Sequence, residues 1–180
     1  MNEPTRLSRE ATQEQTRLRL IEAAWQHIAE RGFAATTVRD IARAAGYTQG
    51  AFYSNFSSKE DLLLDLLREH KRAATHNMQR LFEQANDDFD AMLAALRTWS
   101  RELSQDTRPA LLAAELQLMA ARQPEFGAAY AELMIEQRDA YAQLIASQFE
   151  RQDKRPPAPV SELAAALMAM VMGQMIGHAQ

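Results

Sequence analysis

The sequence has 180 residues, 47% of them hydrophobic and 24% charged, which is typical of a globular chain long enough to bury a core. Cysteine is absent, which excludes disulfides and thiol chemistry, and the polar first residues do not resemble a secretory signal. The most apolar run, residues 163–176, is too short to cross a bilayer, so we expect a cytoplasmic protein of one or two domains with no membrane partner.

The formal net charge of −4 is unevenly distributed along the chain. Residues 1–59 carry a net charge of +2, whereas residues 60–180 carry −6. An excess of two positive charges also arises by chance. The asymmetry therefore only weakly favours an N-terminal segment that binds nucleic acid.

The first predicted helix covers residues 13–31. Leu18, Ile21, Trp25 and Ile28 recur at the spacing of one helical face. Gly32 then supplies the left-handed residue that commonly ends a helix.

Residues 36–63 predict two short helices on either side of Gly46, and then a third. Thr37 can accept from the free N–H groups of a first turn, and Asp40 completes a capping box. Thr48 is the cap of the next helix. A helix, a short glycine-containing turn and a second helix form the layout of a DNA-reading helix-turn-helix, here over residues 37–56.

A long fourth helix is predicted to begin at a capping box of Ser57 and Glu60 and to join two domains. We expect a DNA-binding domain over residues 13–70 and a second domain over residues 71–180. In the second domain, apolar periodicity predicts helices that begin near Phe89, Thr107 and Pro124, and a last one capped by Ser161. The expected fold is all-α, with about nine helices and no strand.

Residues 16–70 resemble the N-terminal domain of the TetR/AcrR-type (tetracycline-repressor-like) transcriptional regulators. The resemblance is carried, in order, by RLRLIEAAWQHIAERGF, TTVRDIARAAG, GAFYSNF and SKEDLL. It implies an all-α homodimer whose three-helix N-terminal units read a palindromic DNA operator. It also implies a C-terminal helical domain that binds a small effector and dimerises.

The candidate DNA-binding residues are divided by role. Thr48 and Gln49 begin the recognition helix, where side chains meet base edges, and Gly50 lets the helix approach the duplex closely. Phosphate contacts are expected from the starts of two other helices and from polar residues of the motif. The full set is Arg17, Thr37, Arg39, Tyr47, Thr48, Gln49, Gly50, Phe52, Tyr53, Asn55 and Lys59.

Several of these residues also have purely structural interpretations. Phe52 is as compatible with the core of the small domain as with DNA contact, whereas Phe56 favours the core. Gly50 could relieve crowding, and Arg39 could be a solvated surface residue. Thr37 and Thr48 cap their helices in either case.

Met and aromatic residues on the inward faces of the later helices are the candidates for an effector pocket, and they favour an apolar or aromatic ligand. Each of them is more often a core residue. The pocket set is Met78, Phe82, Met92, Leu96, Trp99, Leu116, Met119, Phe126, Tyr130 and Met134. The candidate dimer contacts are Tyr141, Ile145, Leu167, Met168, Val171, Met172 and Met175.

The sequence offers no pattern typical of an enzyme or of a metal or cofactor site. The four histidines share no metal-ligand spacing, and no nucleophile elbow or phosphate loop is present. We therefore expect a homodimeric, ligand-responsive repressor that is not an enzyme and has no cofactor. The alternative is a helical protein–protein adaptor that keeps the motif only as a scaffold.

Overall fold

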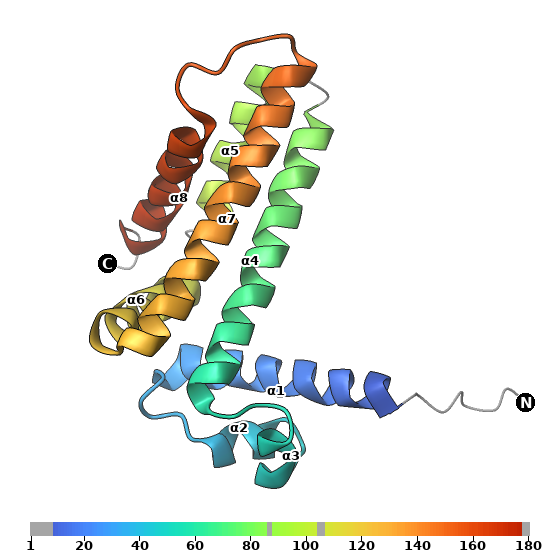
Figure 1. The fold of residues 1–180 in the computed structure, drawn as a ribbon, viewed down its shortest axis with the longest axis vertical. Coiled ribbons are helices and arrows are strands. Elements are labelled where there is room, and N and C mark those ends of the chain that lie inside the picture. Colours follow the sequence, from blue (N-terminus) through green and yellow to red (C-terminus); the bar gives the residue numbers. More distant parts are fainter. Residues whose placement is uncertain (1–8, 86–87, 104–106, 178–180) are drawn as a thin grey trace, which may run out of the picture. The chain divides into compact units, whose positions relative to one another are not determined.

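The computed structural model describes residues 9–85, 88–103 and 107–177. Within these ranges it is built from helices alone, as predicted, and it has eight of them where about nine were expected (Figure 1). They are α1 (Arg9–Arg31), α2 (Val38–Ala44), α3 (Gln49–Tyr53), α4 (Lys59–Gln84), α5 (Phe89–Leu103), α6 (Thr107–Arg122), α7 (Pro124–Arg151) and α8 (Val160–Gly177).

The chain forms two compact units, residues 1–67 and 68–180, and the long helix α4 runs from one into the other. The domains predicted over residues 13–70 and 71–180 also meet on this helix. Because α4 is continuous, its first turns belong to the first unit and the rest of it to the second.

The core of the first unit is built from the apolar faces of α1, α2, α3 and the start of α4. Its fully buried side chains include Leu20, Ile41, Phe52, Phe56 and Leu62. Beside this core, the Arg17 guanidinium on α1 forms an ion pair with the Asp65 carboxylate on α4. This long-range pair, which the sequence did not reveal, ties the two ends of the unit together.

Helix α4 begins one residue later than predicted. The hydroxyl of Ser58 accepts from the backbone N–H of Asp61, at 3.0 Å, and the Asp61 carboxylate accepts from the backbone N–H of Ser57, at 2.9 Å. The prediction of a Ser57–Glu60 capping box is therefore wrong. Two adjacent serines followed by two adjacent acidic residues allow either register, and the later one is adopted.

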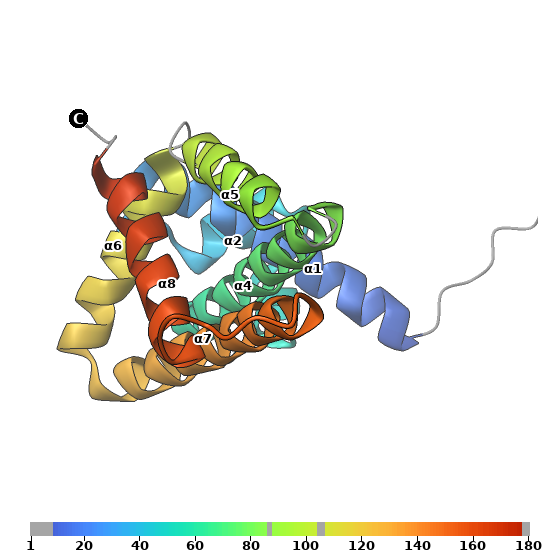
Figure 2. The same cartoon turned by 90° about the horizontal axis from the view of Figure 1, so that it is seen from above.

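The second unit has its own core, formed where α4, α5, α7 and α8 pack together (Figure 2). Its buried residues are Met78, Phe82, Ala85, Met92, Tyr141 and Ala164. Helix α8 also lies against α6, and α6 against α7. The second unit therefore packs five helices together.

The ends of the later helices follow the sequence signals with one exception. Asp88 caps α5 by accepting from the N–H groups of Asp90 and Ala91, at 2.9 and 3.1 Å, and Pro124 is the first residue of α7. Helix α8 begins at Val160, so Ser161 lies inside its first turn and is not the predicted cap. No helix in the described residues combines the length and apolarity that a membrane span requires.

Candidate nucleic-acid interface

Helix α2 is fixed at its start by the predicted capping box. The backbone N–H of Asp40 donates to the Thr37 hydroxyl at 3.1 Å, and the backbone N–H of Thr37 donates to the Asp40 carboxylate at 3.3 Å. The hydrogen bond from the Thr37 hydroxyl holds the pKa of Asp40 below its ordinary value. This confirms the cap and places Arg39 in the first turn of α2, where its side chain is exposed.

The turn between α2 and α3 is a Schellman motif centred on Gly46. The Gly46 N–H donates to the Arg43 carbonyl at 3.1 Å, and the Tyr47 N–H donates to the Ala42 carbonyl at 2.8 Å. Gly46 has a φ of +79°, a conformation that side chains disfavour. Gly46 therefore ends α2 sharply and allows α3 to pack against α2.

Helix α3 is five residues long and begins at the predicted cap, where the Thr48 hydroxyl accepts from the Ala51 N–H at 3.2 Å. Thr48, Gln49 and Gly50 are all exposed at this end. A Cβ added to Gly50 would lie 3.6 Å from the Thr48 hydroxyl oxygen, which is ordinary van der Waals contact. Crowding inside the protein therefore does not explain this glycine.

Phe52 is a correction to the candidate DNA-binding residues. Its side chain is 0% exposed, and its ring packs 5.6 Å from that of Phe56. A fully buried ring cannot touch DNA, so the prediction that Phe52 contacts DNA is wrong. The expectation that Phe56 belongs to the core is confirmed.

The polar residues beside the recognition helix differ in how available they are. Tyr53 is 59% exposed, whereas Tyr47 and Asn55 are half-buried. The amide N–H of Asn55 donates to the Ala51 carbonyl at 2.8 Å, which uses one of its two donors. Phosphate contacts by Tyr47, Tyr53 and Asn55 remain predictions, and Tyr53 is the most accessible of the three.

Two basic candidates make structural contacts within the first unit. The Lys59 ammonium donates to the backbone carbonyls of Phe33 and Thr36, at 2.6 and 2.8 Å, and lies 3.9 Å from the centroid of the Phe33 ring. Arg17 pairs with Asp65. Lys59 thus fastens the loop before α2, a role that the sequence did not predict, and phosphate contact by either residue remains a prediction.

The effector-pocket candidates occupy two places in the second unit. Met78, Phe82 and Met92 belong to its core, with Leu96 and Trp99 packed against them. Leu116 and Phe126 are also buried, while Met119, Tyr130 and Met134 are half-buried. Their role in binding an effector remains a prediction.

Among the dimer candidates, Tyr141 is a correction. It is 4% exposed inside the core of its own unit, so it is unavailable to a second chain. Ile145, Leu167 and Met168 pack against this core, and Val171 and Met172 are half-buried. The side chain of Met175 lies outside those that the structure describes.

A cleft that none of these candidates lines lies between α4 and α7. Its volume is about 500 Å³, and eight of its ten lining residues have polar or charged side chains. The sequence signal was available, because its α4 residues recur every three or four positions along the edge of the apolar stripe. Among the described residues, no group of three or more His, Cys, Asp or Glu side chains could hold a metal ion.

The exposed start of α3, held by a Schellman turn and two capped helices, defines the first unit as a helix-turn-helix domain, a class that includes many DNA-binding regulators. Residues 20–66 match the model of the bacterial regulatory proteins of the tetR family. Over this segment, the chain is similar to the N-terminal part of that family.

Individual regulators are also similar to part of the chain. The chain is 40% identical over 90 residues to the transcriptional regulator TtgR of Pseudomonas putida, covering 48% of the chain and 40% of TtgR. It is 53% identical over 49 residues to the repressor KstR2 of Mycobacterium tuberculosis, covering 27% of the chain and 24% of KstR2. The matched segments thus span less than half the length of these curated relatives.

The likeness in fold extends further along the chain. The crystal structure of the regulator FadR from Bacillus subtilis, in complex with stearoyl-CoA, covers 89% of this chain and 85% of its own, with a TM-score of 0.68. At 20% identity, this likeness concerns the fold alone.

Proposed function

We propose that the protein is a homodimeric transcriptional repressor that binds a palindromic operator and is released from it by a small molecule. The observation that carries the DNA-binding part is the exposed start of α3, where Thr48, Gln49 and Gly50 stand clear of the core. Side chains at the start of a recognition helix are the first to reach base edges in the major groove. Since the family acts on DNA in the cell, we place the protein in the cytoplasm.

Dimerisation would rest on α7 and α8, paired with the same helices of a second copy. The supporting feature is the outward face of α8, where Ala165, Ala166, Ala169 and Gly173 are exposed together with Met170. Small residues let two helices approach closely, and an apolar exposed face favours a partner over water. A dimer would hold two recognition helices about 34–36 Å apart, one helical turn of DNA.

Release would follow from a small molecule bound in the second unit, as FadR was solved with stearoyl-CoA. The Met and aromatic content of this unit favours a ligand with an apolar or aromatic part. Helix α4 is common to both units, so a ligand that favours one tilt of α4 would shift the population of DNA-binding conformers. Nothing in the comparisons supports the adaptor alternative.

The test is a gel-shift titration with DNA from upstream of the protein's own gene, followed by a scan of base substitutions in the bound site. Gln49→Ala should lose discrimination at one position per half-site, by about 1–3 kcal/mol. Gln84→Ala, which removes an exposed glutamine from the end of α4, is the matched control. Equal weakening on every sequence would show that Gln49 is not a base reader, and no binding to any upstream DNA would favour the adaptor.

A further inference from the structure

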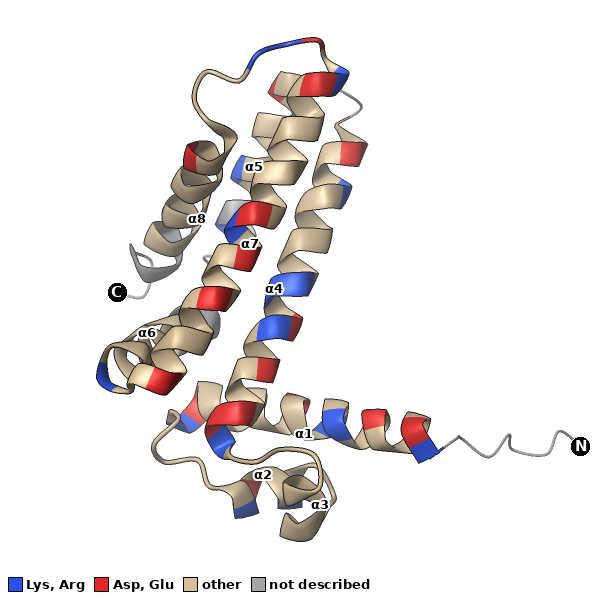
Figure 3. Ribbon diagram, viewed as in Figure 1, with Lys and Arg blue, Asp and Glu red and all other residues tan. Residues whose placement is uncertain are grey.

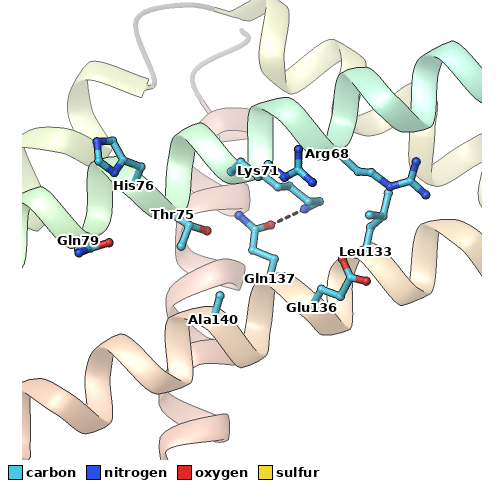
Figure 4. A pocket seen from close by; sticks show the side chains of 10 residues that line it. Arg68, Lys71, Thr75, His76, Gln79, Leu133, Glu136, Gln137 and Ala140 are labelled. Carbon is cyan, nitrogen blue, oxygen red and sulfur yellow. Dashed lines mark hydrogen bonds between the residues drawn. The ribbon is translucent and has the colours of Figure 1, made fainter. Parts of the chain in front are cut away.

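The cleft between α4 and α7 lies wholly in the second unit and is lined by one stripe from each helix (Figure 4). On α4 the stripe recurs every three or four residues, and on α7 it does the same. The α4 residues are Arg68, Lys71, Arg72, Thr75, His76 and Gln79; those of α7 are Leu133, Glu136, Gln137 and Ala140. A volume of about 500 Å³ lies within the range of small-molecule sites.

The lining of this cleft is basic. Arg68, Lys71 and Arg72 contribute three positive charges against one negative charge from Glu136. Figure 3 shows Lys and Arg gathered along the middle of α4. This excess stands out in a part of the chain, residues 60–180, whose net charge is −6.

Lys71 is the most distinctive of these cations. Its ammonium reaches across the cleft and donates to the side-chain carbonyl of Gln137 on α7 (Figure 4). No carboxylate in the described part of the chain forms an ion pair with it. Burial alone lowers the pKa of Lys71 from 10.5 to about 8, so the ammonium loses hydration without a neighbouring anion to compensate.

Gln137 is held in the orientation that this contact needs. Its amide nitrogen donates to the Tyr141 hydroxyl at 3.0 Å, which turns the amide oxygen toward Lys71. Tyr141 is fixed in the core of the unit. The Lys71 ammonium is therefore positioned in advance, and two of its three donors remain for a ligand.

We propose that this cleft binds a small organic molecule through an anionic group, a carboxylate or a phosphate, with Lys71 as its principal contact. Leu133 and Ala140 offer apolar surface to the rest of the molecule. An amphipathic anion thus fits the basic lining of the cleft, and it also has the apolar part that the Met and aromatic content of the second unit favours. The proposal rests on the proposed function only where the ligand is taken to be the effector.

Ordinary surface charge accounts for Arg72 but not for Lys71. Arg72 is exposed and pairs with Glu69 at 3.0 Å, as solvated helix residues commonly do. A half-buried ammonium with a neutral partner differs, because its desolvation is uncompensated. An incoming anion supplies the missing charge, and Lys71 therefore carries the inference.

The experiment measures binding of the fluorescent anion 1-anilinonaphthalene-8-sulfonate to the full-length protein, with the uncharged N-phenyl-1-naphthylamine as the matched probe. Lys71→Gln should weaken binding of the anion about tenfold and leave the neutral probe unchanged. Glu136→Gln, which removes the opposing charge, should strengthen anion binding by about threefold. Arg80→Gln, on α4 but outside the lining, is the control and should change neither.

Octanoate and octyl phosphate then compete with the anionic probe. Displacement by either supports the proposal and identifies the head group; displacement by neither overturns it, as does equal loss of both probes in Lys71→Gln. Should Lys71→Gln fail to fold, the sign of the Glu136→Gln effect decides, because an unchanged or weaker affinity contradicts a site for anions.

A gel shift with and without the displacing anion separates this inference from the proposed function. Specific anion binding that leaves operator affinity unchanged supports the site and removes its role as the effector site. Operator binding by a protein that holds no anion overturns the site and leaves the repressor intact.

Discussion

Gly50→Ala separates the stability of the recognition helix from its fit to DNA. Gly50 is the second residue of α3, and its backbone is helical rather than left-handed. The nearest atom to an added Cβ, the Thr48 hydroxyl oxygen, lies 3.6 Å away, so alanine fits without displacing anything. Alanine also loses less backbone entropy than glycine on entering a helix.

The expected gain in the free energy of unfolding is therefore about 0.5–1 kcal/mol. If α3 enters the major groove with Gly50 toward the duplex, the same methyl group meets the DNA. Operator affinity should then fall at least about tenfold, or about 1.4 kcal/mol. Stability and DNA affinity would thus move in opposite directions.

Urea unfolding and gel-shift titration on the same preparation measure the two quantities. Gly46→Ala is the contrasting variant, because at a φ of +79° a side chain strains the backbone, and its free energy of unfolding should fall by about 1 kcal/mol. A stable Gly50→Ala protein with unchanged operator affinity would refute the close approach. A loss of stability in this variant would refute the packing argument instead.

Three further substitutions test contacts that the structure reveals. Lys59→Ala removes two hydrogen bonds to backbone carbonyls, so the free energy of unfolding in urea should fall by about 1–3 kcal/mol. If the salt slope of DNA binding also falls by about one, Lys59 contacts a phosphate as well; an unchanged slope would exclude that contact. Asp65→Ala leaves the half-buried Arg17 with only its longer pair to the exposed Glu14, at 3.5 Å, so urea unfolding should show a cost of about 1–3 kcal/mol. A cost near zero would mean that Glu14 or water replaces the lost pair. Binding of the anionic probe should fall as the pH rises from 7 to 9, because Lys71, with a pKa of about 8, loses its charge. In Lys71→Arg the affinity should stay constant over this pH range, since arginine keeps its charge. If the affinity of both proteins falls in parallel, another group is responsible for the titration. The other charged or titratable residues of the cleft are Arg68, Arg72, His76 and Glu136.

The helix-turn-helix could be predicted in detail because its signals are local. Thr37, Asp40, Gly46 and Thr48 act on backbone groups within a few residues of themselves, and each behaves as its sequence context indicates. The predicted cap of α4 failed for the same local reason. Neighbouring Ser and acidic residues gave two registers of equal quality, and the sequence alone does not choose between them.

Residues that act over a distance could not be assigned in this way. Phe52 was ambiguous because an aromatic residue on a short helix can face either the core or the DNA, and only the packing of α1 against α3 decides. The Arg17–Asp65 pair joins residues 48 positions apart. Lys59 was assigned to phosphate from its place at a helix start, yet its ammonium binds carbonyls 26 and 23 residues earlier in the chain.

Helix α4 explains why a ligand in the second unit would matter to the first. Its first turns carry Lys59 and Asp65, which hold the loop before α2 and the middle of α1. Further along, Lys71 lines the cleft, and two to three turns later on the same side of the helix Met78 and Phe82 enter the core. If the proposed anion is the effector, its binding would act on this helix by favouring one tilt over another. The size of the response is then limited by how much more tightly the anion binds one tilt than the other.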